Sequence, residues 1–267
     1  MSDPVPDTSL FLRSRRPGKV QILQCFGAHS QESHHFRVPS VRTPFAGNPG
    51  MPRPFRIYVE GLSVHVMHRG INRMPIFQED DDYHAFLRIV RYGARQEGVD
   101  IHAFAVMTNH YHLQVTPRHA LALSRAMKRV NSDYSHYYNR KHRRTGTIWG
   151  HRPRTVLIED ERQWLTCLRY IEQNPVRAGL VSRPQDYLWS SYRVHALGEP
   201  TSWLAPHATY QSLGASPRAR QEAYGAMCST PLTESELAIQ RCPLPDRRKL
   251  PLVPTVAPDG SDIRQTA

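Results

Sequence analysis

Two histidines separated by one residue, His110 and His112, are the residues whose types and spacing point most directly to chemistry. They lie in a segment, 110–116, that has the composition of a β-strand, and side chains two apart in a strand project to the same side. Both imidazoles would therefore face one point, close enough to hold a single metal ion. The alternative is a chance pair, because the chain has 15 histidines.

A tyrosine and an asparagine four residues apart, Tyr170 and Asn174, form a second candidate pair. The segment 160–174 is predicted to be a helix, and residues four apart lie one above the other on a helix face. A phenolic hydroxyl and an amide oxygen would then reach the same point. The alternative is that Tyr170 packs in the core and that Asn174 ends the helix, since Pro175 biases the preceding residue away from helical geometry.

The stretch 118–154, which lies between these two pairs, is strongly basic, with Asp133 as its only acidic residue. Its basic residues are Arg118, Arg125, Lys128, Arg129, Arg140, Lys141, Arg143, Arg144, Arg152 and Arg154, and its interleaved aromatic residues are Tyr134, Tyr137, Tyr138 and Trp149. Arginines pair with phosphates and aromatic faces stack on unpaired bases. Together with a net charge of +12, this composition predicts a nucleic-acid partner. A solvated helix face with ordinary core aromatics is the alternative.

The elements that must position these residues follow from hydrophobic periodicity and from turn signals. They are a strand over 62–68, a helix over 80–96 ended by Gly98, strands over 101–107 and 110–116, a helix over 120–138, a strand over 154–158 and a helix over 160–174. Asp160 and Gln163 form a capping-box pattern at the start of the last helix. This order predicts an α+β fold, a ferredoxin-like antiparallel sheet with helices on one face. Two further short helices are expected, one after Ser216-Pro217 and one from Thr233 with Glu236 at its capping position.

Composition divides the chain into four expected segments. Residues 1–50 are a disordered extension, 51–195 carry the candidate site, 196–242 form a small helical region and 243–267 are a disordered tail. We expect the functional protein to begin near Met51; a basic arm over 1–50 that touches DNA is the alternative. No apolar run approaches the roughly 18 residues that span a bilayer. The four scattered cysteines fit reduced thiols, so a cytoplasmic protein without a membrane partner is expected.

Six short motifs follow one another along the chain in an order that is typical of one protein family. They are His65-Val66-Met67-His68-Arg69-Gly70-Ile71-Asn72-Arg73, Met107-Thr108-Asn109-His110-Tyr111-His112-Leu113, Tyr138-Asn139-Arg140, Arg144-Thr145-Gly146-Thr147-Ile148-Trp149, Tyr170-Ile171-Glu172-Gln173-Asn174-Pro175-Val176-Arg177-Ala178-Gly179-Leu180-Val181 and Trp189-Ser190-Ser191-Tyr192. In these motifs the chain, over about residues 51–200, resembles the REP-associated tyrosine transposases, which belong to the single-tyrosine HUH class of insertion-sequence transposases. It departs from their pattern at Ile71, where the family commonly carries asparagine, and at His151, where an acidic or amide residue is expected.

The resemblance implies an HUH nuclease fold in which Tyr170 is the nucleophile and His110, His112 and Asn174 hold Mg²⁺ or Mn²⁺. It implies cleavage and rejoining of single-stranded, hairpin-flanked DNA through a 5′-phosphotyrosine intermediate, in association with the nucleoid. It is compatible with a monomer and with a homodimer. The residues predicted to contact DNA are Arg69, Asn72, Arg73, Lys128, Arg129, Arg140, Arg143, Arg144, Trp149, Arg152 and Arg154.

Three other functions compete with this interpretation. The first is a sequence-specific DNA-binding protein that has lost cleavage. The second is a metal-dependent hydrolase that uses the histidine pair to activate water and leaves no protein–DNA adduct. The third is a ribosomal-type RNA-binding protein, in which the histidines have no role.

Overall fold

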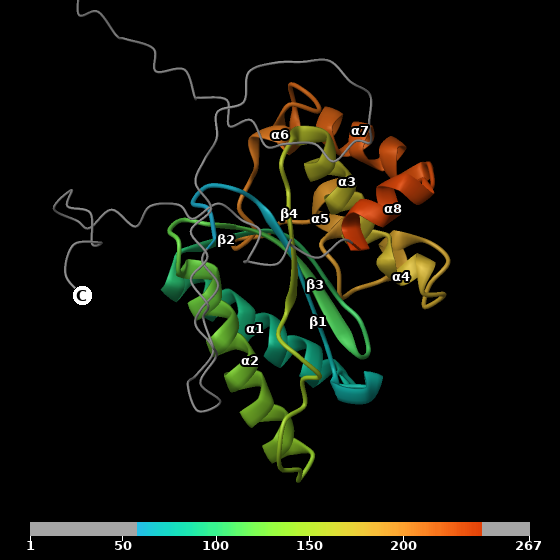
Figure 1. The fold of residues 1–267 in the computed structure, drawn as a ribbon. Helices are drawn as coiled ribbons and strands as arrows, with labels where there is room; N and C mark the ends of the chain where they lie inside the picture. The colour runs from blue at the N-terminus through green and yellow to red at the C-terminus, as the bar shows by residue number, and fades with distance from the viewer. Residues whose placement is uncertain (1–57, 242–267) are drawn as a thin grey trace, which may run out of the picture. The chain divides into compact units, whose positions relative to one another are not determined.

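The computed structural model describes residues 58–241, and the predicted segments 1–50 and 243–267 lie outside this range. Within it the strands are β1 (Val64–Arg69), β2 (Val99–Val106), β3 (His110–Pro117) and β4 (Arg154–Leu157). The helices are α1 (Asp80–Glu97), α2 (Ala122–Lys141), α3 (Glu161–Glu172), α4 (Asn174–Arg177), α5 (Tyr192–Leu197), α6 (Ala208–Gln211), α7 (Pro217–Ser229) and α8 (Glu234–Arg241), and η1 (Ile71–Arg73) and η2 (Pro184–Asp186) are 3-10 turns (Figure 1).

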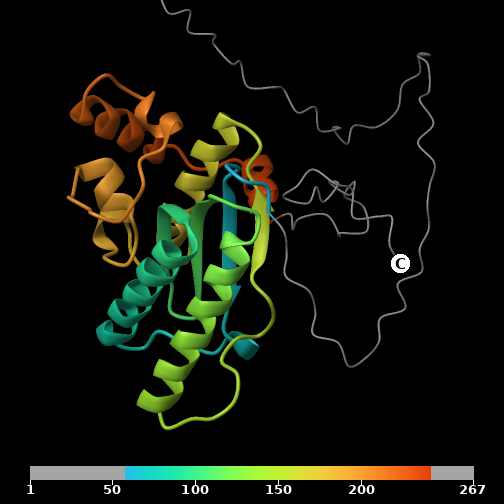
Figure 2. The same ribbon diagram turned by 90° about the vertical axis from the view of Figure 1, so that its left-hand side faces the viewer.

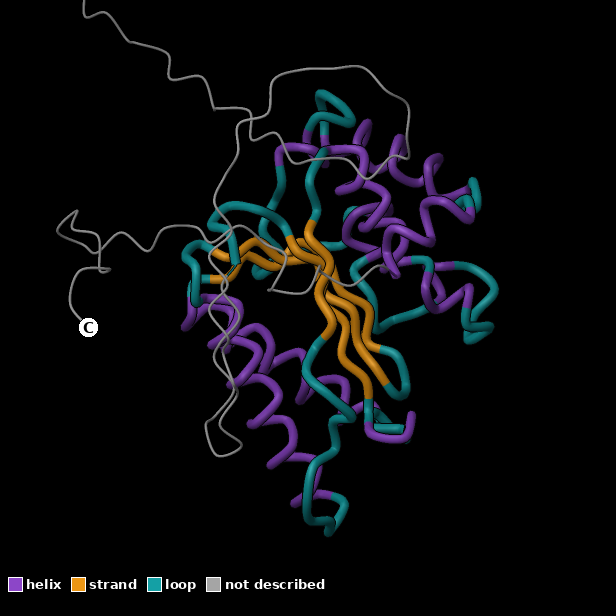
Figure 3. Tube along the Cα trace, viewed as in Figure 1, coloured by secondary structure: helices purple, strands orange, loops and turns teal. Residues whose placement is uncertain are grey.

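The four strands form one antiparallel sheet in the order β2-β3-β1-β4 (Figure 3). Helix α1 connects β1 to β2, and helix α2 connects β3 to β4. This strand–helix–strand–strand–helix–strand arrangement is the predicted ferredoxin-like one, so the α+β class is confirmed. Each strand lies within a few residues of its predicted position, which is the usual accuracy of element ends.

Helices cover both faces of this sheet. The crossover helices α1 and α2 lie side by side against one face, as predicted (Figures 1 and 2), where they pack on Tyr111, Leu113 and Val115 of β3. Helix α3 packs on the opposite face, against Ala103 and Ala105 of β2. The prediction of helices on one face therefore holds for the crossover helices alone. Because helices cover both faces, both alternating sets of side chains in β2 and β3 are largely buried.

The sequence signals at the helix ends act as expected. Gly98 ends α1 in the left-handed conformation, at φ 68°. The side chains of Asp160 and Ser216 accept hydrogen bonds from the first turns of α3 and α7. Thr233 and Glu236 bond reciprocally at the start of α8, which is a capping box. Within residues 58–241, no helix is long and apolar enough to cross a bilayer.

The outer edge of β2 is covered by the segment that follows η2. The amide of Val106 donates to the carbonyl of Trp189 at 2.8 Å, and the amide of Ser191 donates to that of Phe104 at 3.0 Å. Further along the strand, the amide of Ala205 donates to the carbonyl of Ile101 at 2.7 Å. The polar backbone groups of this edge strand are thus paired within the chain.

Candidate active site

The histidine pair lies on the sheet face that α3 covers. In the register of β1 with β3, His110 is opposite Arg69 and His112 is opposite Met67, so all four side chains share that face. The rings of His110 and His112 are 5.0 Å apart between centroids, at 79° to each other. His112 is buried and His110 is half-buried. The two imidazoles therefore meet on one side of the sheet, as the spacing predicted.

Helices α3 and α4 bring the second pair to the same place. The ring of Tyr170 is 5.7 Å from that of His112, edge to face, and Nδ2 of Asn174 is 2.9 Å from Nε2 of His112. Both Tyr170 and Asn174 are buried. The helical path resumes at Asn174 because Pro175 occupies the first turn of α4, where a missing N–H is tolerated. The structure thus joins His112, Tyr170 and Asn174 in one cluster.

A third histidine, His65 of β1, belongs to this cluster and was not predicted from the sequence. Its Nε2 lies 2.9 Å from Nδ1 of His112, and the two rings stack with centroids 5.1 Å apart. It also meets Tyr170 edge to face at 5.5 Å. His65 pairs with Gln114 in the register, one step along the same face from His112. Only the strand register reveals this neighbour, because the two histidines are 47 residues apart in sequence.

The orientation of His110 is set by its own neighbour in sequence. Its Nδ1 lies 2.7 Å from Oδ1 of Asn109. The amide nitrogen of Asn109 donates to the backbone carbonyl of Arg73 at 3.0 Å, which fixes the amide with its oxygen toward the ring. Since that oxygen can only accept, Nδ1 of His110 is the donor. The lone pair of His110 is then on Nε2.

Burial keeps all three imidazoles uncharged at neutral pH. Desolvation lowers the pKa of His65 to about 3. Desolvation, reinforced by the charge of Arg69, lowers the pKa of His110 to about 4. Burial, together with neighbouring positive groups, places the pKa of His112 well below its ordinary value. Neutral imidazole is the form that binds a metal ion.

Two arginines border the cluster, and one of them was not among the predicted site residues. The guanidinium of Arg177 lies 4.6 Å above the ring of Tyr170, within the range of a cation–π contact. Arg69, a predicted DNA contact, is half-buried, and its Nε has no hydrogen-bond partner within the described part of the chain. Positive charge therefore stands on both sides of the tyrosine–histidine cluster. Arg177 lies in the motif that runs from Tyr170 to Val181, and nothing else in the sequence singled it out.

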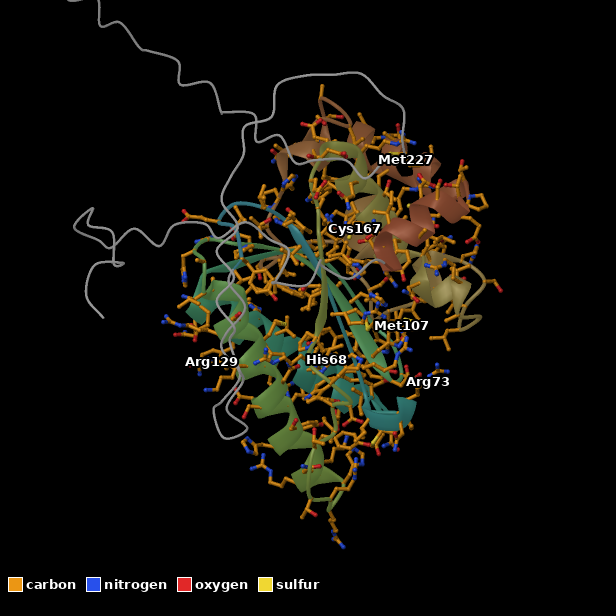
Figure 4. The ribbon with its side chains drawn as sticks, in the orientation of Figure 1. His68, Arg73, Met107, Arg129, Cys167 and Met227 are labelled. Carbon is orange, nitrogen blue, oxygen red and sulfur yellow. The ribbon has the colours of Figure 1, made fainter. Side chains whose placement is uncertain are left out.

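The remaining predicted DNA contacts are spread over several elements. Asn72 and Arg73 are exposed in η1 with left-handed φ values of 52° and 58°. Arg73 belongs to η1 at the end of the sheet, and Arg129 lies on α2 (Figure 4). Arg129 pairs with Glu97 at 3.2 Å. The other exposed basic residues of the predicted set are Lys128, Arg140, Arg143, Arg152 and Arg154.

Two predicted residues have other contacts in the structure. Trp149 is buried, its ring stacks on His68 at 4.3 Å, and its Nε1 donates to the backbone of Asn131. The predicted stacking of Trp149 on a base is therefore not supported, because its face is already covered. Arg144 lies over the ring of Tyr138 and against the sulfur of Met74.

The donor set of the cluster fits a divalent metal ion. Among residues 58–241, no group of three or more His, Cys, Asp or Glu side chains is arranged to hold a metal. A site here would therefore combine Nε2 of His110 and of His112 with the amide oxygen of Asn174. Imidazole nitrogens and amide oxygens are ligands that Mn²⁺ accepts, and oxygen donors are those that Mg²⁺ prefers.

A buried carboxylate fastens α3 to the helices that follow it. Glu172 is fully buried and accepts hydrogen bonds from Ser191 at 2.5 Å, from Nδ1 of His195 at 2.7 Å and from the hydroxyl of Tyr224 at 2.6 Å. Ser191 precedes α5, and Tyr224 lies in α7. The helix that carries Tyr170 is thus held by α5 and α7 as well as by the sheet.

One family of known proteins matches part of the chain. Residues 58–174 match the family described as Transposase IS200 like. The match covers less than half of the 267 residues, so it shows a likeness to the IS200-like transposases over residues 58–174, and the motifs of the chain resemble those of the REP-associated tyrosine transposases.

Individual relatives are distant. A REP-associated tyrosine transposase bound to a REP hairpin is 19% identical, with a TM-score of 0.48, over 59% of this chain and 93% of that one. A protein from Deinococcus radiodurans R1 described as a transposase is 24% identical, with a TM-score of 0.29, over 43% and 91%. The tRNA(His) guanylyltransferase from Saccharomyces cerevisiae is 10% identical, with a TM-score of 0.36, over 67% and 82%. No curated protein matches the chain.

Proposed function

We propose that this protein is a transposase that cleaves and rejoins single-stranded DNA with Tyr170 as its nucleophile. The observation that carries the proposal is the cluster of Tyr170, His112 and Asn174, in which a tyrosine ring, a neutral imidazole and an amide meet on one face of the sheet. The match of residues 58–174 to the IS200-like transposase family supports the reaction class. The hairpin in the complex of the REP-associated relative supports a hairpin-flanked substrate.

In the proposed reaction, the hydroxyl oxygen of Tyr170 attacks the phosphorus of a phosphodiester. The bond from phosphorus to the 3′-oxygen breaks, which leaves a 5′-phosphotyrosine and a free 3′-hydroxyl. The tyrosine gives up one proton and the 3′-oxygen takes up one, so no proton is consumed overall. Because the phosphodiester energy is kept in the phosphotyrosine, a later attack by a 3′-hydroxyl rejoins the strand and frees Tyr170.

His110, His112 and Asn174 would hold the divalent ion in this proposal. When bound, Mg²⁺ or Mn²⁺ supplies positive charge that stabilises the phosphoryl transition state. Burial supports this role of the histidines, because uncharged rings do not repel a cation. The ion is proposed from the donor set and from the resemblance.

Arg69 and Arg177 would bind the scissile phosphate from two sides. Arg177 lies over the ring of Tyr170, and the unpaired Nε of Arg69 is on the same sheet face as His110. Arginine suits this task because its planar guanidinium presents several donors to phosphate oxygens. The exposed Asn72 and Arg73 at the adjacent η1 extend this basic border, and we propose that they contact the flanking DNA.

The test is covalent attachment of DNA to the full chain. The protein is incubated with a hairpin-flanked single strand and Mn²⁺, and adducts are resolved on a denaturing gel. Tyr170→Phe should abolish the adduct and leave DNA binding within about twofold, whereas the matched control Tyr92→Phe, at an exposed tyrosine, should retain it. An adduct that persists in Tyr170→Phe would refute the assignment of the nucleophile.

The competing functions predict other results in the same assay. A metal-dependent hydrolase would nick the strand without an adduct and would tolerate loss of Tyr170. A DNA-binding protein that has lost cleavage would bind the hairpin and leave it intact in the presence of Mn²⁺. An RNA-binding protein would prefer RNA and would be unaffected by replacement of His110 and His112.

A further inference from the structure

We infer that His65 and Asn109 are positioning residues that hold the protons of the two metal-site histidines on Nδ1, so that Nε2 of each is free to bind the ion. The inference rests on the proposed function, since it concerns the ion site of that reaction. Each positioning residue contacts Nδ1 of one histidine, and neither was expected from the sequence to belong to the site. A histidine binds a metal through one nitrogen, and the hydrogen bond at the other decides which nitrogen is available.

Asn109 determines the tautomer of His110. Its amide nitrogen is held by the carbonyl of Arg73, so its oxygen faces Nδ1 of His110 at 2.7 Å. An amide oxygen accepts and cannot donate, which places the proton of His110 on Nδ1. Nε2 of His110 is then unprotonated without any contribution from the ion.

His65 plays the same part for His112 through a nitrogen. Nε2 of His112 lies 2.9 Å from the amide nitrogen of Asn174, which donates, so Nε2 of His112 carries the lone pair. The proton of His112 is therefore on Nδ1 and is donated to Nε2 of His65 at 2.9 Å. His65 then carries its own proton on Nδ1, an atom that is buried and has no hydrogen-bond partner among residues 58–241.

The unpartnered Nδ1 of His65 indicates that this side chain has a role beyond filling space in the core. A buried polar group without a partner costs about 1 to 3 kcal/mol, and an aliphatic side chain at this position would avoid the cost. The stacked contact of His65 with His112 also restrains the plane of the second ring. When the amide of Asn174 turns its oxygen toward the ion, the contact with His65 is the remaining hydrogen bond that keeps Nε2 of His112 free of a proton.

The experiment compares three full-length proteins: the wild type, His65→Gln and His65→Phe. Glutamine can accept the proton of His112 through its side-chain oxygen, whereas phenylalanine fills the space and accepts nothing. The tautomers of His110 and His112 are read from imidazole ¹⁵N shifts of the metal-free proteins at pH 7.5. The affinity for Mn²⁺ alone is measured by calorimetry, and circular dichroism verifies that each variant folds.

We expect the Nδ1–H tautomer for both histidines in the wild type. His65→Gln should keep it and bind Mn²⁺ within about threefold of the wild type. His65→Phe should keep this tautomer at His112 in the metal-free protein, because the amide of Asn174 still donates to Nε2, but it should bind Mn²⁺ about 10- to 100-fold more weakly, the usual effect of removing such a contact. Asn109→Ala should lose the Nδ1–H tautomer at His110 and weaken Mn²⁺ binding to a similar extent.

Two results would overturn the inference. One is a folded His65→Phe that binds Mn²⁺ within about threefold of the wild type. The other is an Nε2–H tautomer at either histidine in the wild type, which decides the question even if His65→Phe does not fold. A DNA adduct in Tyr170→Phe would instead refute the proposed nucleophile and leave the tautomer result standing.

Discussion

Replacing Tyr224 by phenylalanine removes one oxygen atom from the buried contact between α3 and α7. In the wild type, the hydroxyl of Tyr224 donates to Oε2 of Glu172 at 2.6 Å, and both side chains are fully buried. The phenylalanine ring fills the same space, so the change leaves one carboxylate oxygen without this donor. Because Ser191 and His195 both donate to Oε1, neither compensates at Oε2.

The magnitude follows from the type of bond that is lost. A hydrogen bond to a charged group contributes about 1.5 to 3 kcal/mol, and little of this is recovered where water is excluded. For a folded region of this size, each 1 kcal/mol shifts the melting temperature by about 2 to 4 °C. Tyr224→Phe should therefore lower the melting temperature by about 3 to 12 °C.

Thermal unfolding measured by circular dichroism provides the test, with Tyr92→Phe as the control. Tyr92 is 55% exposed, so loss of its hydroxyl should shift the melting temperature by less than about 1 °C. If Tyr224→Phe melts with the wild type, the carboxylate of Glu172 does not hold α7 to α3 in the way described. In that case, α7 would not restrain the helix that carries Tyr170 through this carboxylate.

Further outcomes follow from buried histidines and from one close approach. Burial lowers the pKa of His65 to about 3, and that of His68 and of His102 to about 4, below the ordinary value of 6.5. The unfolded chain therefore binds more protons below pH 6.5, and stability that is complete above pH 6.5 is lost as the pH falls toward 4. The free energy of unfolding then falls by about 1.4 kcal/mol per pH unit for each histidine. Urea titrations between pH 7 and 5 should show the midpoint of unfolding moving to lower urea concentration. A constant midpoint would contradict the buried, neutral state of these histidines. Gly70→Ala should destabilise the fold by about 1 to 3 kcal/mol, because a Cβ atom there would lie 2.6 Å from the carbonyl oxygen of Met74, whereas Gly225→Ala in α7 meets nothing and should be neutral or stabilising in the same titration. Equal effects of the two substitutions would argue against the close approach at Gly70.

Elements with strong local signals were predictable from the sequence. The helices α1 and α3, the strands β1 to β4 and the capped starts of α7 and α8 all lie near their predicted positions. Hydrophobic periodicity and capping residues act over a few neighbouring positions, so the local sequence is enough to predict these helices and strands. The i, i+2 pair His110 and His112 is local in the same sense, and its rings meet in the structure. The i, i+4 pair Tyr170 and Asn174 meets through His112, which both residues contact.

The parts that could not be predicted depend on contacts distant in sequence. His65 meets His112 only because β1 and β3 pair in one particular register. Trp149 was expected to stack on bases, but composition cannot show that His68 covers its ring. The helices α5 and α6 are short, and their positions depend on packing against α3 and its surroundings more than on periodicity.

The covered edge of β2 has a consequence for how copies of this protein could assemble. A sheet grows from one molecule into the next only where a strand offers unpaired amide and carbonyl groups. Along β2, the groups of Ile101, Phe104 and Val106 are already bonded to residues 189–205 of the same chain. A continuous sheet across two copies is therefore blocked at this strand, and a homodimer, which stays a prediction, would have to form by contacts other than strand pairing at this edge.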